Sequence, residues 1–165
     1  SGDTTVKYTV NAQQSYKATA AAKTYNAKNQ TTKVTVKYGN TVLKRGTDYK
    51  ITGVTKAKNA GKYKITVKGI NNYKGTKTIY YTINKAAQKS VKVKVNASKK
   101  KITVSGVKAK AKVTYKSANK KVKVKNGKIT VGKGVKKGTK VRITVKVAAT
   151  KNYKAYSKSI IYKVK

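Results

Sequence analysis

The sequence predicts an all-β protein built from two β-sandwich domains in tandem. Three observations favour this: apolar and polar residues alternate with a period of two in most segments, turn signals separate these segments at short intervals, and no segment carries a helical pattern. Many short strands joined by regular turns are typical of a sandwich or a barrel. A chain of 165 residues is long enough for two small domains of this kind.

The first half of the chain contains three clear alternating runs. In the first of them Val34, Val36 and Tyr38 alternate with lysine and threonine, so one face of the strand is apolar and the other is cationic. Similar patterns predict strands over residues 63–67 and 79–83. Turns are expected at Gly39-Asn40 and at Asn59-Ala60-Gly61.

The second half repeats this organisation with longer runs. Strands are expected over residues 91–95, 122–124, 129–131, 141–147 and 160–164. In the longest run Val141, Ile143, Val145 and Val147 alternate with Lys140, Arg142, Thr144 and Lys146. The dipeptide Asn126-Gly127 is the preferred type I′ turn, which predicts a hairpin between residues 122–125 and 128–131.

The domain boundary is expected near residues 85–89, where Ala86-Ala87-Gln88 interrupts the alternation. This divides the chain into a first sandwich domain, residues 1–87, and a second and more basic one, residues 88–165. The two halves also end alike, since Asn72-Tyr73-Lys74 and Asn152-Tyr153-Lys154 each precede a closing strand.

Two stretches carry a family resemblance. Residues 24–84, through the segment 33–49, Asn59-Ala60-Gly61 and the segment 72–76, resemble immunoglobulin-like (Ig-like) repeats of secreted and surface proteins of Gram-positive bacteria. Residues 90–165 are similar to bacterial Ig-like domains of group 2, through the segments 115–119, 122–124 and 126–131 and Gly138-Thr139. The resemblance implies two tandem Ig-like sandwiches acting as a stalk, spacer or adhesion module at an extracellular or cell-surface location. Such repeats usually carry balanced charge and some proline, and this chain has neither.

Missing residue types exclude most catalytic chemistry. The chain has no His, Cys, Met, Phe, Trp or Pro and only two acidic residues. Histidine acid/base catalysis, thiol nucleophiles, paired carboxylates and His/Cys zinc sites are therefore unavailable to it. A Ser-Lys dyad stays formally open, but both residues are too abundant to identify a pair. We expect a non-enzymatic protein without a cofactor or a metal site.

Of the two acidic residues, Asp48 lies among the predicted strands of the first domain, whereas Asp3 precedes them. In Gly46-Thr47-Asp48-Tyr49 its side chain is expected to accept backbone N–H groups and cap a turn. The alternative is that Asp48 promotes a Lys-Asn isopeptide bond, as occurs in some Gram-positive Ig-like domains, although the sequence identifies no such pair.

Positive charge is the dominant chemical feature. Forty-three Lys and Arg residues face two acids, a formal charge of +41, divided as +15 over residues 1–88 and +26 over residues 89–165. Edge protection explains some surface lysines but not this excess, and a polyanion would release counterions on binding. The predicted partners are DNA or RNA, teichoic acid, acidic glycans and anionic membrane surfaces, and repulsion favours a monomer.

The expected contacts are the local concentrations of charge in the second half. They are Lys99, Lys100, Lys101, Lys120, Lys121, Lys123, Lys125, Lys136, Lys137, Lys140 and Arg142. Two other interpretations stay open: a structural stalk or adhesive repeat, and a designed supercharged variant of one.

The tyrosines divide into two predicted groups. Tyr38, Tyr63, Tyr81 and Tyr162 fall on the apolar side of their strands and are expected in the cores, which have no Phe or Trp. Tyr80, Tyr153 and Tyr156 are expected at the surface, where they could stack on nucleic-acid bases.

Overall fold

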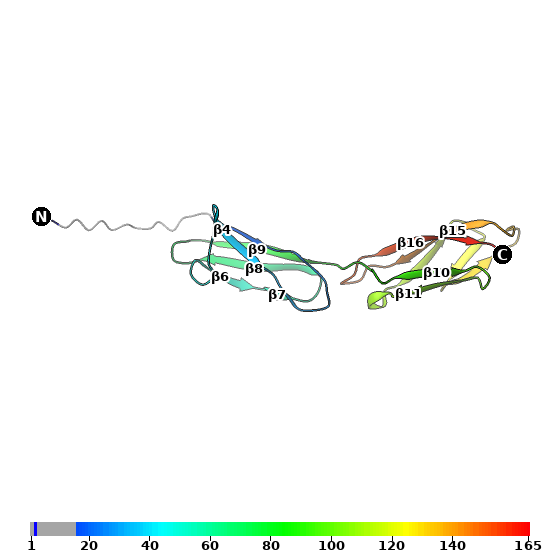
Figure 1. The fold of residues 1–165 in the computed structure, drawn as a ribbon, viewed down its shortest axis with the longest axis horizontal. Helices are drawn as coiled ribbons and strands as arrows, with labels where there is room; N and C mark the ends of the chain where they lie inside the picture. The colour runs from blue at the N-terminus through cyan, green and yellow to red at the C-terminus, as the bar shows by residue number, and fades with distance from the viewer. Residues whose placement is uncertain (1, 3–15) are drawn as a thin grey trace. The chain divides into compact units, whose positions relative to one another are not determined.

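The protein is all-β, as the alternation predicted. The computed structural model describes Gly2 and residues 16–165, and apart from one three-residue 3-10 helix, Lys108–Lys110, the regular elements in that part of the chain are strands (Figure 1). None of the described residues belongs to a helix long and apolar enough to span a membrane. Backbone contacts divide the chain into two compact units, Ser1–Asn84 and Lys85–Lys165, each described separately below.

The first unit arranges its strands in three sheets. Their orders are β1-β4-β5, β2-β9-β8-β6 and β3-β7, and the β2–β9 pair is parallel. The strand bounds are β1 (Lys17–Ala20), β2 (Lys23–Thr24), β3 (Gln30–Thr31), β4 (Val34–Tyr38), β5 (Thr41–Val42), β6 (Tyr49–Gly53), β7 (Lys56–Ala57), β8 (Gly61–Gly69) and β9 (Thr76–Asn84).

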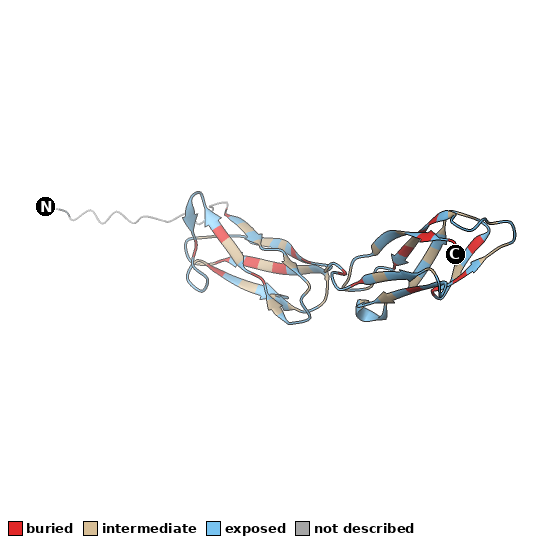
Figure 2. Cartoon of the chain, turned by 45° about the vertical axis from the view of Figure 1, so that its right-hand side comes forward, coloured by how far each residue is buried: buried red, intermediate tan, exposed pale blue. Residues whose placement is uncertain are grey.

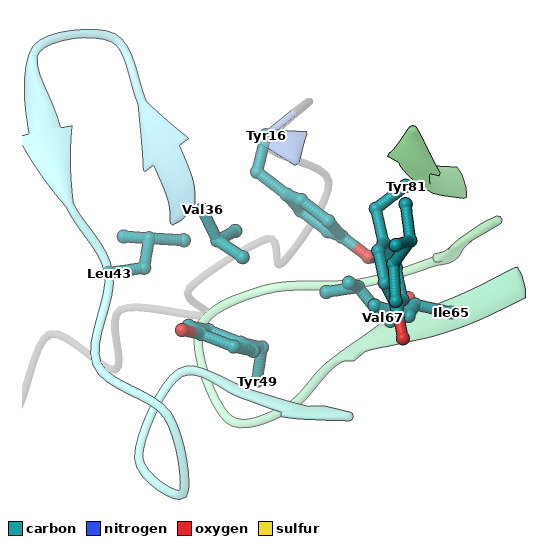
Figure 3. Packing of buried hydrophobic residues seen from close by; sticks show 8 residues of the cluster. Tyr16, Val36, Leu43, Tyr49, Ile65, Val67 and Tyr81 are labelled. Carbon is teal, nitrogen blue, oxygen red and sulfur yellow. Dashed lines mark hydrogen bonds between the residues drawn. The ribbon is translucent and has the colours of Figure 1, made fainter. Parts of the chain in front are cut away.

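Tyrosine fills much of the first core. Tyr16, Tyr49 and Tyr81 are buried there together with aliphatic residues of β4, β8 and β9 (Figure 3). The Tyr16 hydroxyl lies 2.8 Å from the Gly75 carbonyl oxygen and 3.1 Å from that of Val67. The Tyr81 ring stacks on Tyr63 at 5.2 Å between centroids, but its buried hydroxyl has no hydrogen-bond partner among the described residues. The phenols replace the Phe and Trp that the sequence lacks, so their hydroxyls must be accommodated as well.

The second unit is a sandwich of two sheets. One has the order β10-β11-β14-β13 and the other the order β12-β15-β16. The strand bounds are β10 (Lys92–Asn96), β11 (Lys101–Ser105), β12 (Val113–Ser117), β13 (Val122–Lys125), β14 (Lys128–Val131), β15 (Lys140–Val147) and β16 (Tyr156–Lys163).

Both sheets of the second unit contribute to one core. Ile102, Val122 and Ile129 come from the first sheet, and they pack with the apolar residues of β15 and with Tyr162 of β16. Along β15 buried residues alternate with exposed or partly buried ones, and Figure 2 shows buried, partly buried and exposed bands along the strands of the chain. The apolar half of each alternating strand therefore faces the core, and its lysine half faces solvent.

The predicted Asn126-Gly127 hairpin is confirmed. Residues of β13 and β14 pair from Val122 with Val131 to Lys125 with Lys128, and both turn residues have positive φ, 50° and 81°. A side chain at Gly127 would place its Cβ only 2.4 Å from the Ile102 carbonyl oxygen. Glycine is thus required both by the turn and by the neighbouring strand.

The prediction that Tyr38 is a core residue is wrong. Tyr81 and Tyr162 are buried and Tyr63 is partly buried, but Tyr38 is 40% exposed. It is the last residue of β4, next to the hairpin turn, and its ring centroid lies 6.1 Å from that of Tyr73. Of the tyrosines expected at the surface, Tyr80 is exposed, whereas Tyr153 and Tyr156 are partly buried.

The predicted role of Asp48 as a turn cap is confirmed. The backbone N–H of Lys44 donates to Asp48 Oδ2 at 2.7 Å, and the Asp48 N–H donates to the Lys44 carbonyl oxygen at 2.8 Å. The isopeptide alternative stays a prediction.

Candidate polyanion-binding surface

Almost every basic side chain that the structure describes reaches solvent. Lys23 and Lys77 are partly buried, and every other described Lys or Arg is exposed. Lys77 extends along the first core and places its Nζ atom 5.3 Å from the centroid of the Tyr16 ring. For most lysines within strands this exposure follows from alternation, which gives them the face opposite the core, and many of the others lie in turns and loops.

Three lysines form a row across the first sheet of the second unit. Lys101 of β11 pairs with Lys128 of β14, and Lys128 pairs with Lys125 of β13. Directly paired residues point to the same face of an antiparallel sheet, and all three are exposed. Since neighbouring strands lie about 4.8 Å apart, the row spans about 10 Å at the backbone.

This row is unfavourable in the absence of an anion. Like charges directly opposite one another destabilise a sheet, and two unit charges about 5 Å apart repel by about 0.8 kcal/mol even in water. The second unit contains no acidic side chain to compensate them. An anionic group above Lys128 would attract all three ammonium groups at once.

A shallow pocket of about 310 Å³ lies beside the row. It is lined by Lys99, Lys100, Lys101, Asn126, Gly127 and Lys128. Two backbone hydrogen bonds join the turns that form it: Ile102 N–H donates to the Gly127 carbonyl oxygen at 2.7 Å, and Ile129 N–H donates to that of Lys100 at 2.8 Å. The pocket is therefore part of the hydrogen-bonded sheet rather than a free loop.

A second group of lysines borders the gap between β12 and β13. Lys120 and Lys123 line a hollow of about 380 Å³ together with Lys116 and Tyr115, whereas Lys121 is not part of its lining. Asn119 shapes the turn, because its Oδ1 atom accepts the Lys121 N–H at 2.9 Å. Burial raises the pKa of the Tyr115 phenol, so this ring stays neutral near pH 7 and offers the lysines no negative charge.

The third group lies on the other sheet. Lys136 and Lys137 belong to the loop before β15, and Lys140 and Arg142 lie on β15 itself. Lys140 pairs directly with Lys163 of β16, which makes another pair of like charges.

The eleven predicted contacts thus do not form a single patch. Lys101, Lys123 and Lys125 share the outer face of the first sheet, whereas Lys140 and Arg142 lie on the outer face of the second.

Sequence reasoning missed several lysines that the sheets place beside the predicted ones. They are Lys92, Lys94, Lys116, Lys128, Lys146 and Lys163. Lys128 could have been found, since the Asn126-Gly127 turn fixes its pairing with Lys125.

No protein-family model, no curated protein and no solved structure matches this chain. The chemistry of the surface must therefore be judged from its own groups. Arg142 is the one guanidinium of the second unit, and the remaining cations there are lysines. Lysine acts as a mobile point charge without the planar fork that reads guanine or grips phosphate in two places, so this surface suits attraction without sequence specificity.

Proposed function

We propose that the chain is a non-enzymatic polycationic module that binds polyanions, either nucleic acid or anionic cell-surface polymers, by non-specific electrostatics. The observation that carries this proposal is the row formed by Lys101, Lys128 and Lys125 in a unit without acidic residues. A fold maintained only for its core would gain nothing from aligning three like charges across adjacent strands.

The energetic argument is counterion release. A nucleic acid or a teichoic acid condenses cations along its backbone, and each lysine that neutralises a phosphate sets one free. The free energy gained depends on charge density rather than on base or sugar identity. An extended array of exposed lysines with little Arg fits this mode of binding.

The test is a salt titration of binding to a labelled single-stranded DNA, with teichoic acid, a sulfated glycan and anionic vesicles as parallel probes. A protein that makes 6–10 phosphate contacts should lose about 10³–10⁵ in affinity between 50 and 200 mM salt. An affinity that stays constant over this range for all probes would overturn the proposal.

A charge variant locates the binding surface. In Lys101→Gln/Lys125→Gln/Lys128→Gln, the slope of log K against log salt should fall by about 2 for single-stranded DNA, at about 0.7 for each phosphate that is no longer neutralised. The matched control is Lys28→Gln/Lys58→Gln/Lys74→Gln, which removes the same charge from exposed positions of the first unit. Equal slopes for the two variants would show that DNA does not prefer the row.

We further propose that both units are Ig-like and belong to an extracellular or cell-surface protein. The strand order of the second unit supports the first part: with β10 to β16 taken as strands A to G, its sheets are ABED and CFG, as in constant-type immunoglobulin domains. The alternative role, a stalk or adhesive repeat, is favoured by the two consecutive all-β units with separate cores. A stalk would bind none of the soluble probes saturably.

A further inference from the structure

The second unit carries positive charge on both outer faces of its sandwich. The four-strand face is the outer side of the sheet β10-β11-β14-β13, and the three-strand face is the outer side of the sheet β12-β15-β16. The cations of the four-strand face are Lys92, Lys94, Lys101, Lys123, Lys125 and Lys128.

The cations of the three-strand face come from all of its strands. They are Lys116, Lys140, Arg142, Lys146 and Lys163. Lys116 pairs with Thr144, and Lys146 lies between Thr114 and Ser157, so that hydroxyls stand beside the charges. The Thr144 and Ser159 hydroxyl oxygens are 3.0 Å apart and hydrogen-bonded. This face is therefore polar and cationic, with Ile161 as its exposed apolar exception.

The core separates the two faces. Ile102 and Ile129 point inward from the first sheet, and Ile143 and Val145 point inward from the second. Their exposed neighbours along each strand must point the opposite way, outward from the sandwich. Two packed sheets lie about 10 Å apart, so a polymer segment lying flat on one face does not touch the other except at the β12–β13 edge, where Lys116 and Lys123 line the same hollow.

A phosphodiester chain is one polyanion whose charges this surface can bind. Lysine ammonium groups bind phosphate as compact point charges, and the pocket beside Lys128 offers three further lysines at one place. A chain of phosphodiesters supplies such a charge at every repeat. This chemistry is shared by nucleic acid and by teichoic acid.

We infer that the second unit bridges two phosphodiester chains, one on each outer face, and so crosslinks polyanions instead of merely coating them. The inference rests on the proposed polyanion binding and adds the number of polymer chains, two, that one protein binds at once. A single flexible chain wrapped around both faces is the competing arrangement, and the following experiment separates the two.

The experiment measures binding and bridging independently on the full chain. Fluorescence anisotropy of a labelled single-stranded DNA reports binding. For bridging, beads that carry an immobilised DNA are loaded with protein below saturation. The amount of a second, labelled DNA that these beads then capture reports bridging. The same pair of assays with teichoic acid distinguishes the two sources of phosphodiester.

Three variants remove the same charge from different places. The four-strand variant carries Lys94→Gln, Lys101→Gln, Lys123→Gln, Lys125→Gln and Lys128→Gln. The three-strand variant carries Lys116→Gln, Lys140→Gln, Arg142→Gln, Lys146→Gln and Lys163→Gln. The control divides the loss between the faces with Lys101→Gln, Lys125→Gln, Lys140→Gln, Arg142→Gln and Lys163→Gln. All these positions are exposed, so the core is unchanged.

We expect all three variants to bind DNA with reduced affinity, because each loses five cations that can neutralise phosphates. Bridging should fall at least fivefold further in each one-face variant than in the control. Equal bridging in all three variants would overturn the inference and assign crosslinking to the first unit or to self-association. Binding without any capture, even by the unmodified protein, would identify the wrapped arrangement. Absence of DNA and teichoic-acid binding by the unmodified protein would instead overturn the proposed function.

Discussion

The two units are both all-β, but they differ in charge and in the residues that form their cores. The first has 16 basic and 2 acidic residues and buries three tyrosines, Tyr16, Tyr49 and Tyr81. The second has 27 basic residues and no acid, and its core is Val and Ile with one fully buried tyrosine, Tyr162. The more strongly charged unit therefore folds with the more aliphatic core. Charge and core composition vary independently, because alternation assigns them to opposite faces of each strand.

The largest expected effect tests whether the two cores are independent. Ile65 and Ile143 are both fully buried on central strands, one in each unit. Ile65→Ala and Ile143→Ala should each lower the free energy of unfolding of their own unit by about 2–5 kcal/mol, because apolar burial is reduced and a cavity remains. Hydrogen exchange followed by mass spectrometry measures the effect unit by unit. Loss of protection in both units from either substitution would contradict independent cores.

A smaller effect is expected from Asp48, whose substitution should destabilise the first unit and leave the second unchanged. The carboxylate accepts the Lys44 N–H, and the second unit has no acidic residue that could do the same. Asp48→Ala should destabilise the first unit by about 1.5–3 kcal/mol, the range for hydrogen bonds to charged groups. Thermal unfolding checks this, with Asp48→Asn as the control that keeps an acceptor oxygen. If both variants unfold at the temperature of the unmodified protein, the cap is unimportant.

Each core contains one buried tyrosine hydroxyl without a hydrogen bond to the described residues, and removing that hydroxyl should stabilise the unit. The hydroxyls of Tyr81 and Tyr162 are buried and have no hydrogen-bond partner in the part of the chain that the structure describes. Tyr81→Phe and Tyr162→Phe should each stabilise their unit by about 1–2 kcal/mol, because an unpaired buried hydroxyl is removed while the ring stays.

Tyr16→Phe is the matched control for both of these substitutions. The Tyr16 hydroxyl is hydrogen-bonded to the Val67 and Gly75 carbonyl oxygens, so its removal should lower the free energy of unfolding by about 1 kcal/mol. Chemical denaturation measures all three changes. A destabilising effect of the same size in all three variants would mean that the two unpaired hydroxyls are in fact satisfied.

The smallest effect concerns the lysine row. Lys128→Thr should stabilise the second unit by about 0.5–1 kcal/mol at low salt, since it removes two cross-strand repulsions. The gain should shrink at 0.5 M salt, where charges are screened within a few ångströms.

The control for that substitution is Lys94→Thr on the same face. Lys94 pairs with Thr103 and has no lysine directly opposite. It should change stability less than Lys128→Thr does. Melting temperatures that are independent of salt in the unmodified protein and in both variants would contradict the repulsion argument.

The strands with the longest alternation could be predicted from the sequence alone. Residues 34–38, 122–125, 128–131 and 141–147 are strands as expected, because a period of two has one structural interpretation. Besides the short strands β1, β2, β3, β5 and β7, three strands of five residues were not predicted: β6, β11 and β12. Each of them presents only two alternating large apolar side chains, such as Ile102 and Val104 in β11, and so carries too short a pattern to distinguish.

For the candidate surface, too, only the local features could be predicted from the sequence. The sequence by itself determined that most strand lysines face solvent, because they alternate with apolar residues, and it determined that Lys125 faces Lys128, because the intervening turn fixes the hairpin register. Only the tertiary structure brought Lys101 beside Lys128 and placed Lys140 and Arg142 on the opposite face. Those relations join strands that are distant in the chain, and they depend on which sheet each strand enters, a choice made by core packing rather than by local pattern.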